Sequence, residues 1–204
     1  MSQQTLLKIG GVPVYYDEEI GRCWWTGEMT LDADGCPRAY GPEGCSPAPL
    51  DYLANAGYPG NWWGIVTVDG EPFEQEKGAL EKWPYPGLYV STTAYLVPGY
   101  GSTDCRRYVD SELVPFSVVP GNVRMSIPPK FLGCRARITD KTHHKHLDCV
   151  IADVGPSNHL GEASLYAAKF FGVNSNPKNG GSSDRKRWLY ECWPGEEAKG
   201  FVLQ

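Results

Sequence analysis

Two carboxyl side chains, Asp153 and Glu162, stand where acid–base chemistry is expected. Asp153 follows an apolar run, and Gly155-Pro156 just after it must end the strand, so the side chain is expected at a sheet rim where loops form a cleft. Glu162, in the segment GEAS, is expected in the first turn of a helix that returns to the same rim. Two carboxyls across a cleft can hydrolyse a glycosidic bond, although both placements are also ordinary structural ones.

Other chemistries have weaker support. His143, His144 and His146 fall in one tetrapeptide, but Lys141 and Lys145 beside them disfavour a cation, so we expect a solvated turn and no metal. The chain has no G-x-S-x-G elbow and no glycine-rich phosphate loop. No cofactor is therefore expected.

The seven cysteines leave their redox state open. No two of them form a C-x-x-C pair, which argues against a structural zinc site. Cys134 and Cys149 flank a predicted hairpin that turns at Lys141-Thr142, and this hairpin would set them opposite each other. Direct opposition permits a disulfide without requiring one.

The elements that must position the two carboxyls are short strands. The 204 residues include 24 Gly and 17 Pro, which favour tight turns over long helices, and seven Trp, twelve Tyr and six Phe, which argue against disorder. Strands are predicted over residues 62–68, 87–93, 116–120, 135–139 and 146–153, and residues 31–44 are rich in turn signals. Glu162 to Phe171 is predicted to be a helix capped by Gly172, with a shorter helix over residues 51–56. We predict a mainly β protein: a small six-stranded β-barrel with one or two short helices and long loops, in a single domain over residues 1–204.

The charge is unevenly distributed. The net charge is −5, but residues 17–81 hold 13 acidic and three basic side chains, which attracts cationic ligands or simply solvates a face. The basic tripeptide at residues 185–187 is too small to indicate nucleic-acid binding.

No apolar stretch is long enough to cross a membrane, and residues 1–10 have no apolar region typical of a secretory signal. We expect no membrane insertion. The protein is then either retained inside the cell, trimmed, or exported by a route that needs no such signal.

Several long segments resemble one enzyme family. The runs LDYLANAGYPGNWWGIVT (residues 50–67), GLYVSTTAY (87–95), RRYVDSELVPFSVVPG (106–121) and IADVGPSNHLGEASLYAAKFFG (151–172) resemble glycoside hydrolases of family 75, the chitosanase type. DADGCPRAYGPEG (32–44) and the late WPG (193–195) are similar to that family too. The chain departs from it at Gly41, where family members often carry His, and in GEAS, where they have GEGS.

The resemblance implies an inverting, endo-acting hydrolysis of β-1,4 bonds in chitosan without a metal, with Asp153 and Glu162 as the essential carboxyls. By analogy Glu162 would be the general acid and Asp153 the base, although a helix N-terminus at Glu162 would favour its charged form. The strand ending in Asp-x-Gly-Pro also resembles double-psi β-barrel proteins that act on β-1,4 glycans.

Substrate-binding residues are expected in the acidic segment. Carboxylates would attract partly cationic glucosamine, and aromatic rings would stack on sugar faces. Of Trp62 and Trp63, one ring is expected in the core and one outside. The candidates are Asp32, Asp34, Tyr40, Glu43, Asp51, Asn61, Trp62 and Trp63.

Two other functions stay open. The first is a peptidoglycan-cleaving antibacterial effector of the same fold, muramidase-like, for which an immunity protein would be a partner. The second is a non-catalytic glycan-binding or wall-loosening module. In all three cases the partner is a polysaccharide, the protein is expected to act outside the cytoplasm, secreted or delivered, and neither nucleic acid nor membrane is involved.

Overall fold

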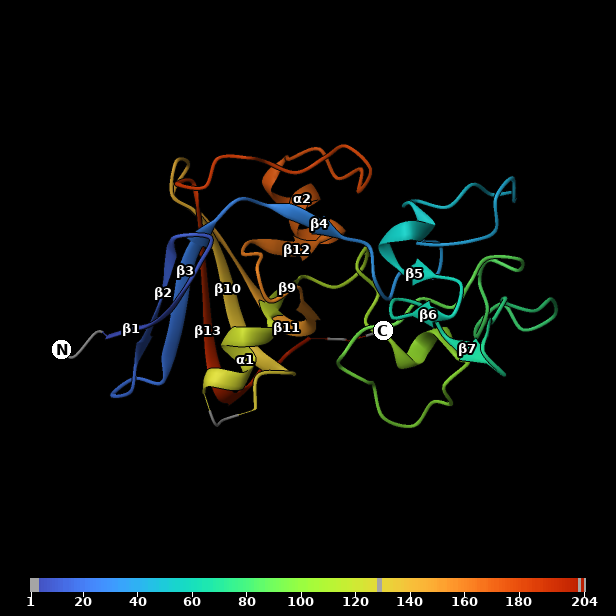
Figure 1. Cartoon of the computed structure of the whole chain (residues 1–204), viewed down its shortest axis with the longest axis horizontal. Coiled ribbons are helices and arrows are strands. Elements are labelled where there is room, and N and C mark those ends of the chain that lie inside the picture. The colour runs from blue at the N-terminus through green and yellow to red at the C-terminus, as the bar shows by residue number, and fades with distance from the viewer. Residues whose placement is uncertain (1–3, 128–129, 202, 204) are drawn as a thin grey trace.

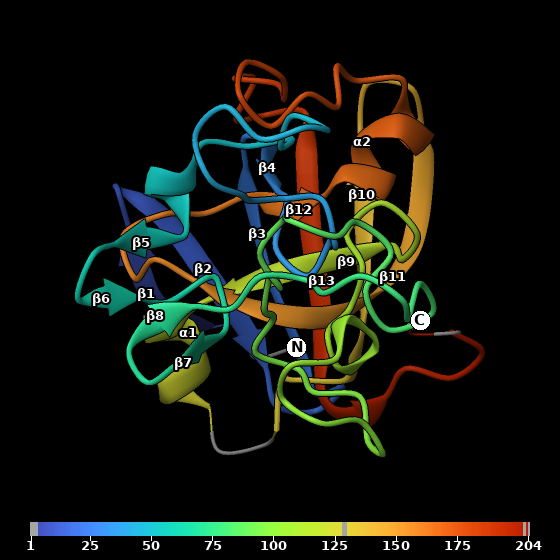
Figure 2. The same cartoon turned by 90° about the vertical axis from the view of Figure 1, so that its right-hand side faces the viewer.

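The computed structural model describes residues 4–127, 130–201 and 203, and shows a mainly β protein. Its main element is a nine-stranded mixed sheet that curls into a half-barrel, in the order β1-β2-β3-β13-β10-β11-β9-β12-β4 (Figures 1 and 2). The strands are β1 (Gln4–Ile9), β2 (Val12–Asp17), β3 (Arg22–Gly27), β4 (Thr30–Asp32), β9 (Phe116–Pro120), β10 (Cys134–Asp140), β11 (Lys145–Gly155), β12 (Glu162–Ser164) and β13 (Trp188–Glu197).

Two short helices accompany the sheet. Helix α2 (Leu165–Phe171) packs against β4, β11 and β12, and α1 (Gly121–Ser126) packs against β9 and β11. Gly172 ends α2 in the left-handed conformation, as its position in the sequence predicts. We refer to the nine-stranded sheet with α1 and α2 as the sheet half.

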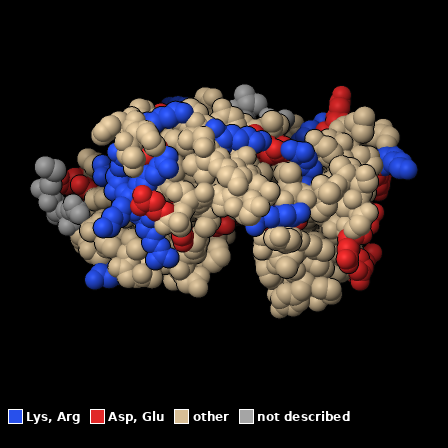
Figure 3. All heavy atoms as spheres, turned by 90° about the horizontal axis from the view of Figure 1, so that it is seen from above, with Lys and Arg blue, Asp and Glu red and all other residues tan. Residues whose placement is uncertain are grey.

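Residues 33–113, between β4 and the segment that enters β9, form a second part that we call the small lobe (Figure 1, right). It contains the hairpins β5 (Gly57–Tyr58) with β6 (Asn61–Trp62) and β7 (Thr67–Val68) with β8 (Glu71–Pro72). It also holds two 3₁₀ turns, η1 (Leu53–Asn55) and η2 (Cys105–Arg107). The space-filling view shows a groove between the sheet half and the small lobe (Figure 3).

Buried apolar side chains form clusters in each part and one cluster that spans both. The largest cluster lies in the sheet half and includes Trp25, Trp188 and Tyr190. A smaller cluster around Tyr40, Ala56 and Ile65 belongs to the small lobe and meets the sheet half at Leu165 of α2. A third cluster joins the two parts, because it combines Val97 and Val109 of the small lobe with Phe116 and Val150 of the sheet half. The groove thus lies between two regions that share part of their core. No helix among the described residues combines the length and apolar character that crossing a bilayer requires.

The predicted strands of the sheet half are confirmed, and those of the small lobe are present only as short fragments and isolated bridges. Strands β9, β10 and β11 match the predictions at residues 116–120, 135–139 and 146–153. Residues 62–68 are instead interrupted at Gly64, where the amides of Trp63 and Gly64 both donate to the carbonyl of Ala56 and the chain bends. Residues 87–93 form only isolated bridges, through Tyr89 and Ser91. β-Branched composition had indicated strands there. Residues 87–93 do exchange backbone hydrogen bonds with residues 64–66 and 73–75, but these do not form the continuous ladder of a strand.

Other strands of the sheet were not predicted. No strand was expected over residues 4–27, 30–32 or 188–197, and residues 162–164 were expected in a helix, so the main sheet has nine strands and not six. A hairpin signal was present at Gly10-Gly11, which separates two alternating apolar runs and takes positive φ angles of 54° and 82° in the β1–β2 turn.

The predicted opposition of Cys134 and Cys149 is wrong. The β10–β11 turn occupies residues 141–144, with His144 at φ 53°, so the register is shifted by two residues from the predicted one and Cys149 faces Ala136. All seven cysteines are free thiols. His143 and His144 lie exposed in this turn, as expected, and Nδ1 of His143 lies 2.7 Å from Oδ2 of Asp140.

Candidate active site

Four carboxyl side chains converge at the junction of the sheet half and the small lobe. Asp32 ends β4, Asp34 follows it by two residues, Asp153 lies near the end of β11, and Glu162 begins β12. Strands β12 and β4 pair in parallel, with Glu162 opposite Thr30 and Ser164 opposite Asp32. Because side chains alternate along a strand, Glu162 and Asp32 project from the same face of the sheet.

Asp153 is a buried carboxylate held by backbone amides. The residue is 9% exposed, and its Oδ1 accepts hydrogen bonds from the amides of Val154 at 2.7 Å and Ala94 at 3.0 Å. Burial raises the pKa of Asp153 to about 6, and the two amides offset part of that rise because they favour the charged form. Ala94 belongs to the small lobe, so both parts of the molecule position this carboxyl.

Glu162 lies in a strand and not in the first turn of a helix, which corrects the sequence prediction. The helix begins at Leu165, because Ser164 is its N-cap and accepts a hydrogen bond from the amide of Ala167. The preceding three residues pair with β4 instead. Glu162 therefore does not lie in the first turn of a helix, where the helix dipole was expected to favour its charged form.

The carboxyl of Glu162 packs against the backbone of Gly155. A Cβ atom built on Gly155 would come within 2.5 Å of Oε2 of Glu162, so only glycine leaves room for the carboxyl in this position. Burial, and next the charge of Asp153, raise the pKa of Glu162 to about 7. At neutral pH a large fraction of Glu162 therefore keeps its proton.

Asp32 and Asp34 complete the cluster from the chain leaving β4. The amide of Asp34 donates to Oδ1 of Asp32 at 2.7 Å, and the hydroxyl of Tyr40 donates to Oδ1 of Asp34 at 2.7 Å. Burial and the neighbouring carboxylates raise the pKa of both groups well above the ordinary range of an aspartate. Ionisation of any one of the four carboxyls therefore opposes ionisation of the others.

A cleft of about 290 Å³ opens beside these carboxyls. Four of its lining residues carry a carboxyl group, which gives the cleft an acidic character. It is lined by Thr30, Leu31, Asp32, Ala33, Asp34, Tyr40, Asp51, Asn55, His159 and Glu162.

One side of this cleft is fixed by a short hydrogen-bond chain in the small lobe. The carboxylate of Asp51 accepts from its neighbour's amide, that of Tyr52, at 2.7 Å and from Nδ2 of Asn55 at 2.9 Å. Asp51 is buried, so these bonds compensate the loss of water around its charge.

Three aspartates could also hold a cation. Asp32, Asp34 and Asp153 each offer a carboxylate oxygen within 4.8 Å of the others, and hard cations such as Mg²⁺ and Ca²⁺ prefer oxygen ligands. Protons compete for the same oxygens because the pKa values of all three groups are raised.

The other binding residues predicted from the sequence fall into two sets. Asp34, Tyr40 and Asp51 line the cleft, but Tyr40 is only 2% exposed, so its ring cannot stack on a sugar and it contributes a hydroxyl to Asp34. Asn61 and Trp62 belong to the β5–β6 hairpin, which lies outside the cleft lining.

The expectation for the tryptophan pair holds. Trp62 packs partly against the small-lobe core, whereas Trp63 is exposed. Glu43 is exposed and outside the cleft lining.

Five residues of the cleft lining were not predicted: the polar Thr30, Asn55 and His159, and the apolar Leu31 and Ala33. Asn55 could have been found from its spacing four residues after Asp51, and His159 from its place between Asp153 and Glu162. Thr30 gave no signal, because only the β4–β12 pairing brings it beside Glu162.

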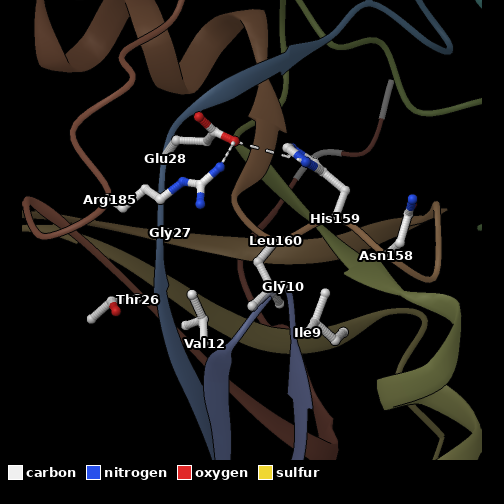
Figure 4. Close-up of a pocket in the computed structure, with 10 residues that line it drawn as sticks. All are labelled: Ile9, Gly10, Val12, Thr26, Gly27, Glu28, Asn158, His159, Leu160 and Arg185. Atoms are coloured by element: carbon white, nitrogen blue, oxygen red, sulfur yellow. Dashed lines mark ion pairs between the residues drawn. The ribbon is translucent and has the colours of Figure 1, made fainter.

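A second, smaller pocket of about 50 Å³ adjoins the cleft at His159 (Figure 4). There Oε1 of Glu28 lies 3.6 Å from Nη2 of Arg185 and 3.9 Å from Nδ1 of His159. The other ring nitrogen of His159 lies 2.8 Å from the hydroxyl oxygen of Thr30. Glu28, Arg185 and His159 of this pocket are thus engaged with one another or with Thr30, which leaves the acidic cleft as the stronger candidate for chemistry.

Comparisons with known proteins give no family assignment. No protein-family model matches the chain, and no curated protein matches it either.

Proposed function

We propose that this protein is a glycoside hydrolase (EC 3.2.1.-) that cleaves β-1,4 bonds of an amino-sugar polysaccharide, with chitosan as its first candidate substrate. The observation that carries the proposal is the carboxyl cluster at the acidic cleft. Glu162 lines the cleft, and Asp153, outside the lining, has a carboxylate oxygen within 4.8 Å of those of Asp32 and Asp34, which do line it. The pKa values of Asp153 and Glu162 are raised to about 6 and about 7. Near pH 6.5 this pair supplies one ionised and one protonated carboxyl, the combination that glycosidic hydrolysis uses.

Glu162 serves as the general acid in this mechanism. Its proton passes to the glycosidic oxygen as the bond between that oxygen and the anomeric carbon breaks, so the leaving sugar departs as a neutral hydroxyl. The higher pKa of Glu162 supports this role, and its strand location removes the helix dipole that would have opposed it.

Asp153 serves as the general base. It accepts a proton from water while the water oxygen bonds to the anomeric carbon from the opposite face, which inverts the configuration at that carbon. The two backbone amides on Oδ1 favour its ionised form, which a base requires. The reaction so written balances with water alone and needs no cofactor.

The acidic lining supports the choice of an amino sugar. Protonated glucosamine units carry positive charge, and Asp32, Asp34 and Asp51 place carboxyls along the cleft that would receive them. The parallel pairings β9–β11 and β4–β12 within an otherwise antiparallel sheet support our proposal that the core is a variant of the double-psi barrel. A substrate of this kind also implies that the protein acts outside the cytoplasm.

The test is release of reducing ends from chitosan, chitin and peptidoglycan. The wild type is expected to act on chitosan, and Asp153→Asn and Glu162→Gln are expected to lose at least ~10²-fold in rate, the usual contribution of acid–base catalysis. Asp148→Asn is the matched control, because Asp148 lies on the same strand but is exposed and paired with Arg137.

Each other outcome has a definite meaning. Unchanged rates in both carboxyl variants would remove Asp153 and Glu162 from the mechanism, and release from peptidoglycan alone would make the protein a muramidase-like effector. Binding without release would favour a glycan-binding module. The anomeric form of the first product, followed by NMR, tests inversion directly.

A further inference from the structure

The aromatic side chains that are more than half exposed gather in one stretch of the small lobe. Among the described residues they are Tyr52, Tyr58 and Trp63, which are 58%, 57% and 55% exposed. Large rings left in water forgo the stabilisation that burial would give. Their concentration within twelve consecutive residues indicates a surface that meets a ligand.

Two of these rings are held in fixed positions. Nε1 of Trp63 donates to the carbonyl of Asn55 at 2.9 Å, which sets the orientation of the indole. Tyr58 packs edge-on against it, with ring centroids 5.9 Å apart and planes at 82°, and Nδ2 of Asn61 donates to the Tyr58 hydroxyl at 3.2 Å. Because the two rings are already ordered, binding a ligand would cost the protein little side-chain entropy.

Asn55 connects this aromatic pair to the acidic cleft. Its backbone carbonyl holds Trp63, while its side-chain amide donates to Asp51, and both Asn55 and Asp51 line the cleft. Neither Tyr58 nor Trp63 is part of that lining. A ligand that fills the cleft and extends past Asn55 would therefore meet the aromatic pair next.

We propose that Tyr58 and Trp63 form a remote sugar subsite, on which a glycan chain already seated in the cleft stacks one or more further rings. The inference rests on the proposed function for the identity of the ligand. A pyranose ring offers a flat face of C–H groups to an aromatic ring, and its hydroxyl groups remain in water, which suits a surface that is half exposed. The subsite selects for chain length, because a short oligosaccharide that fills the cleft does not reach it.

Calorimetric titration with glucosamine oligosaccharides tests the subsite. The protein carries Glu162→Gln throughout, so that no ligand is consumed. Adding Trp63→Ala is expected to weaken binding of the hexasaccharide about tenfold, while binding of the disaccharide stays unchanged. Trp63→Tyr, which keeps a ring, is expected to recover most of the affinity, and Tyr58→Ala gives a second, independent loss. Tyr166→Ala is the control, because Tyr166 is an exposed aromatic residue of α2 in the sheet half.

The outcomes separate this inference from the proposed function. Three results would overturn the subsite. The hexasaccharide could bind equally well with and without Trp63, Trp63→Ala could weaken disaccharide binding as much as hexasaccharide binding, or the hexasaccharide could fail to bind at all. Hexasaccharide binding that depends on Trp63, in a protein whose wild type releases no reducing ends, would sustain the subsite and refute hydrolysis. Reducing-end release by the wild type together with unchanged affinity in Trp63→Ala would refute the subsite alone.

Discussion

In the sheet half, Asp153 and Glu162 project from strands that are paired on both sides, β11 between β10 and β9, and β12 between β9 and β4. In the small lobe, Asp34 and Asp51 project from irregular segments and are held by single side chains, the hydroxyl of Tyr40 and the amide of Asn55. A paired strand fixes a side chain through many backbone hydrogen bonds, whereas a loop depends on a few. Substitutions in the sheet half should therefore appear in the rate of the chemical step, and those in the small lobe in stability and binding.

The largest expected effect is that of Gly155→Ala in the sheet half. The added methyl would meet Oε2 of Glu162 at 2.5 Å and Cγ1 of Val118 at 2.9 Å, so the carboxyl must leave its position. We expect kcat on the glycan to fall ~10²-fold, the usual scale for a misplaced catalytic group, while the melting temperature changes little. Gly101→Ala is the control in the small lobe, because its Cβ would meet no atom within 4 Å. An unaltered kcat in Gly155→Ala would show that the exact placement of Glu162 does not matter.

The next effect tests how the small lobe is held together. The buried side chain of Gln75 accepts from the amide of Tyr85 at 2.9 Å and donates to the carbonyls of Pro37 and Tyr89. Gln75→Leu leaves these backbone groups without their partner, so we expect the free energy of unfolding to fall by about 2 kcal/mol in urea denaturation. The exposed neighbour substitution Glu76→Gln should change it by less than ~0.5 kcal/mol. Equal stability of the two variants would mean that the small lobe does not depend on single side chains.

The pH dependence of activity tests the two catalytic carboxyls together. Asp153 must be ionised and its pKa is raised to about 6, so kcat/KM should rise as the pH increases through that value. Glu162 must be protonated and its pKa is raised to about 7, so the rate should fall above it, by about tenfold per pH unit on each side. Because the two groups interact, the profile reports values for the pair. A rate that is level between about pH 5 and pH 9 would contradict the assignment.

The smallest effect concerns stability and has a definite sign. The raised pKa of Asp34 means that the folded protein binds this proton more tightly than the unfolded chain does, so stability is lost as the pH rises toward the folded pKa. Asp34→Asn cannot ionise and still offers an oxygen to Tyr40. We expect it to be more stable than the wild type by about 1 kcal/mol at about pH 8, and equally stable at about pH 3. The exposed Glu43→Gln should show no such difference, and a destabilised Asp34→Asn at pH 8 would contradict the model of a repulsive carboxyl cluster.

The sequence predicts the sheet half much better than the small lobe. Strands β9, β10 and β11 alternate or are uniformly apolar and are bounded by turns, and Gly155-Pro156 correctly places Asp153 near a strand end. Residues 87–93 have similar β-branched composition but form only isolated bridges, and composition alone does not reveal that.

For the candidate site, too, the sequence indicates residue types better than their tertiary environment. Asp153, Glu162, Asp34 and Asp51 can be selected from residue type and turn context. That Glu162 begins a strand, however, depends on its pairing with Thr30, because Glu-Ala-Ser is equally compatible with a helix start. The burial of Tyr40 likewise follows from tertiary packing around Ala56 and Ile65. The residues of the site could be selected from the sequence, but the exposure of their side chains to solvent could not be predicted from it.

The parallel pairing of β4 with β12 also determines when the site forms during folding. Thr30 and Gly161 are hydrogen-bonded although they lie 131 positions apart, and the small lobe and strands β9, β10 and β11 lie between them in the chain. Closing so long a loop costs chain entropy before its contacts return any stabilisation, so such pairings form slowly. Asp32 and Glu162 should therefore meet only after β9, β10 and β11 have assembled. During synthesis, the cleft cannot exist until β12 has left the ribosome, so an incomplete chain carries no functional arrangement of these carboxyls.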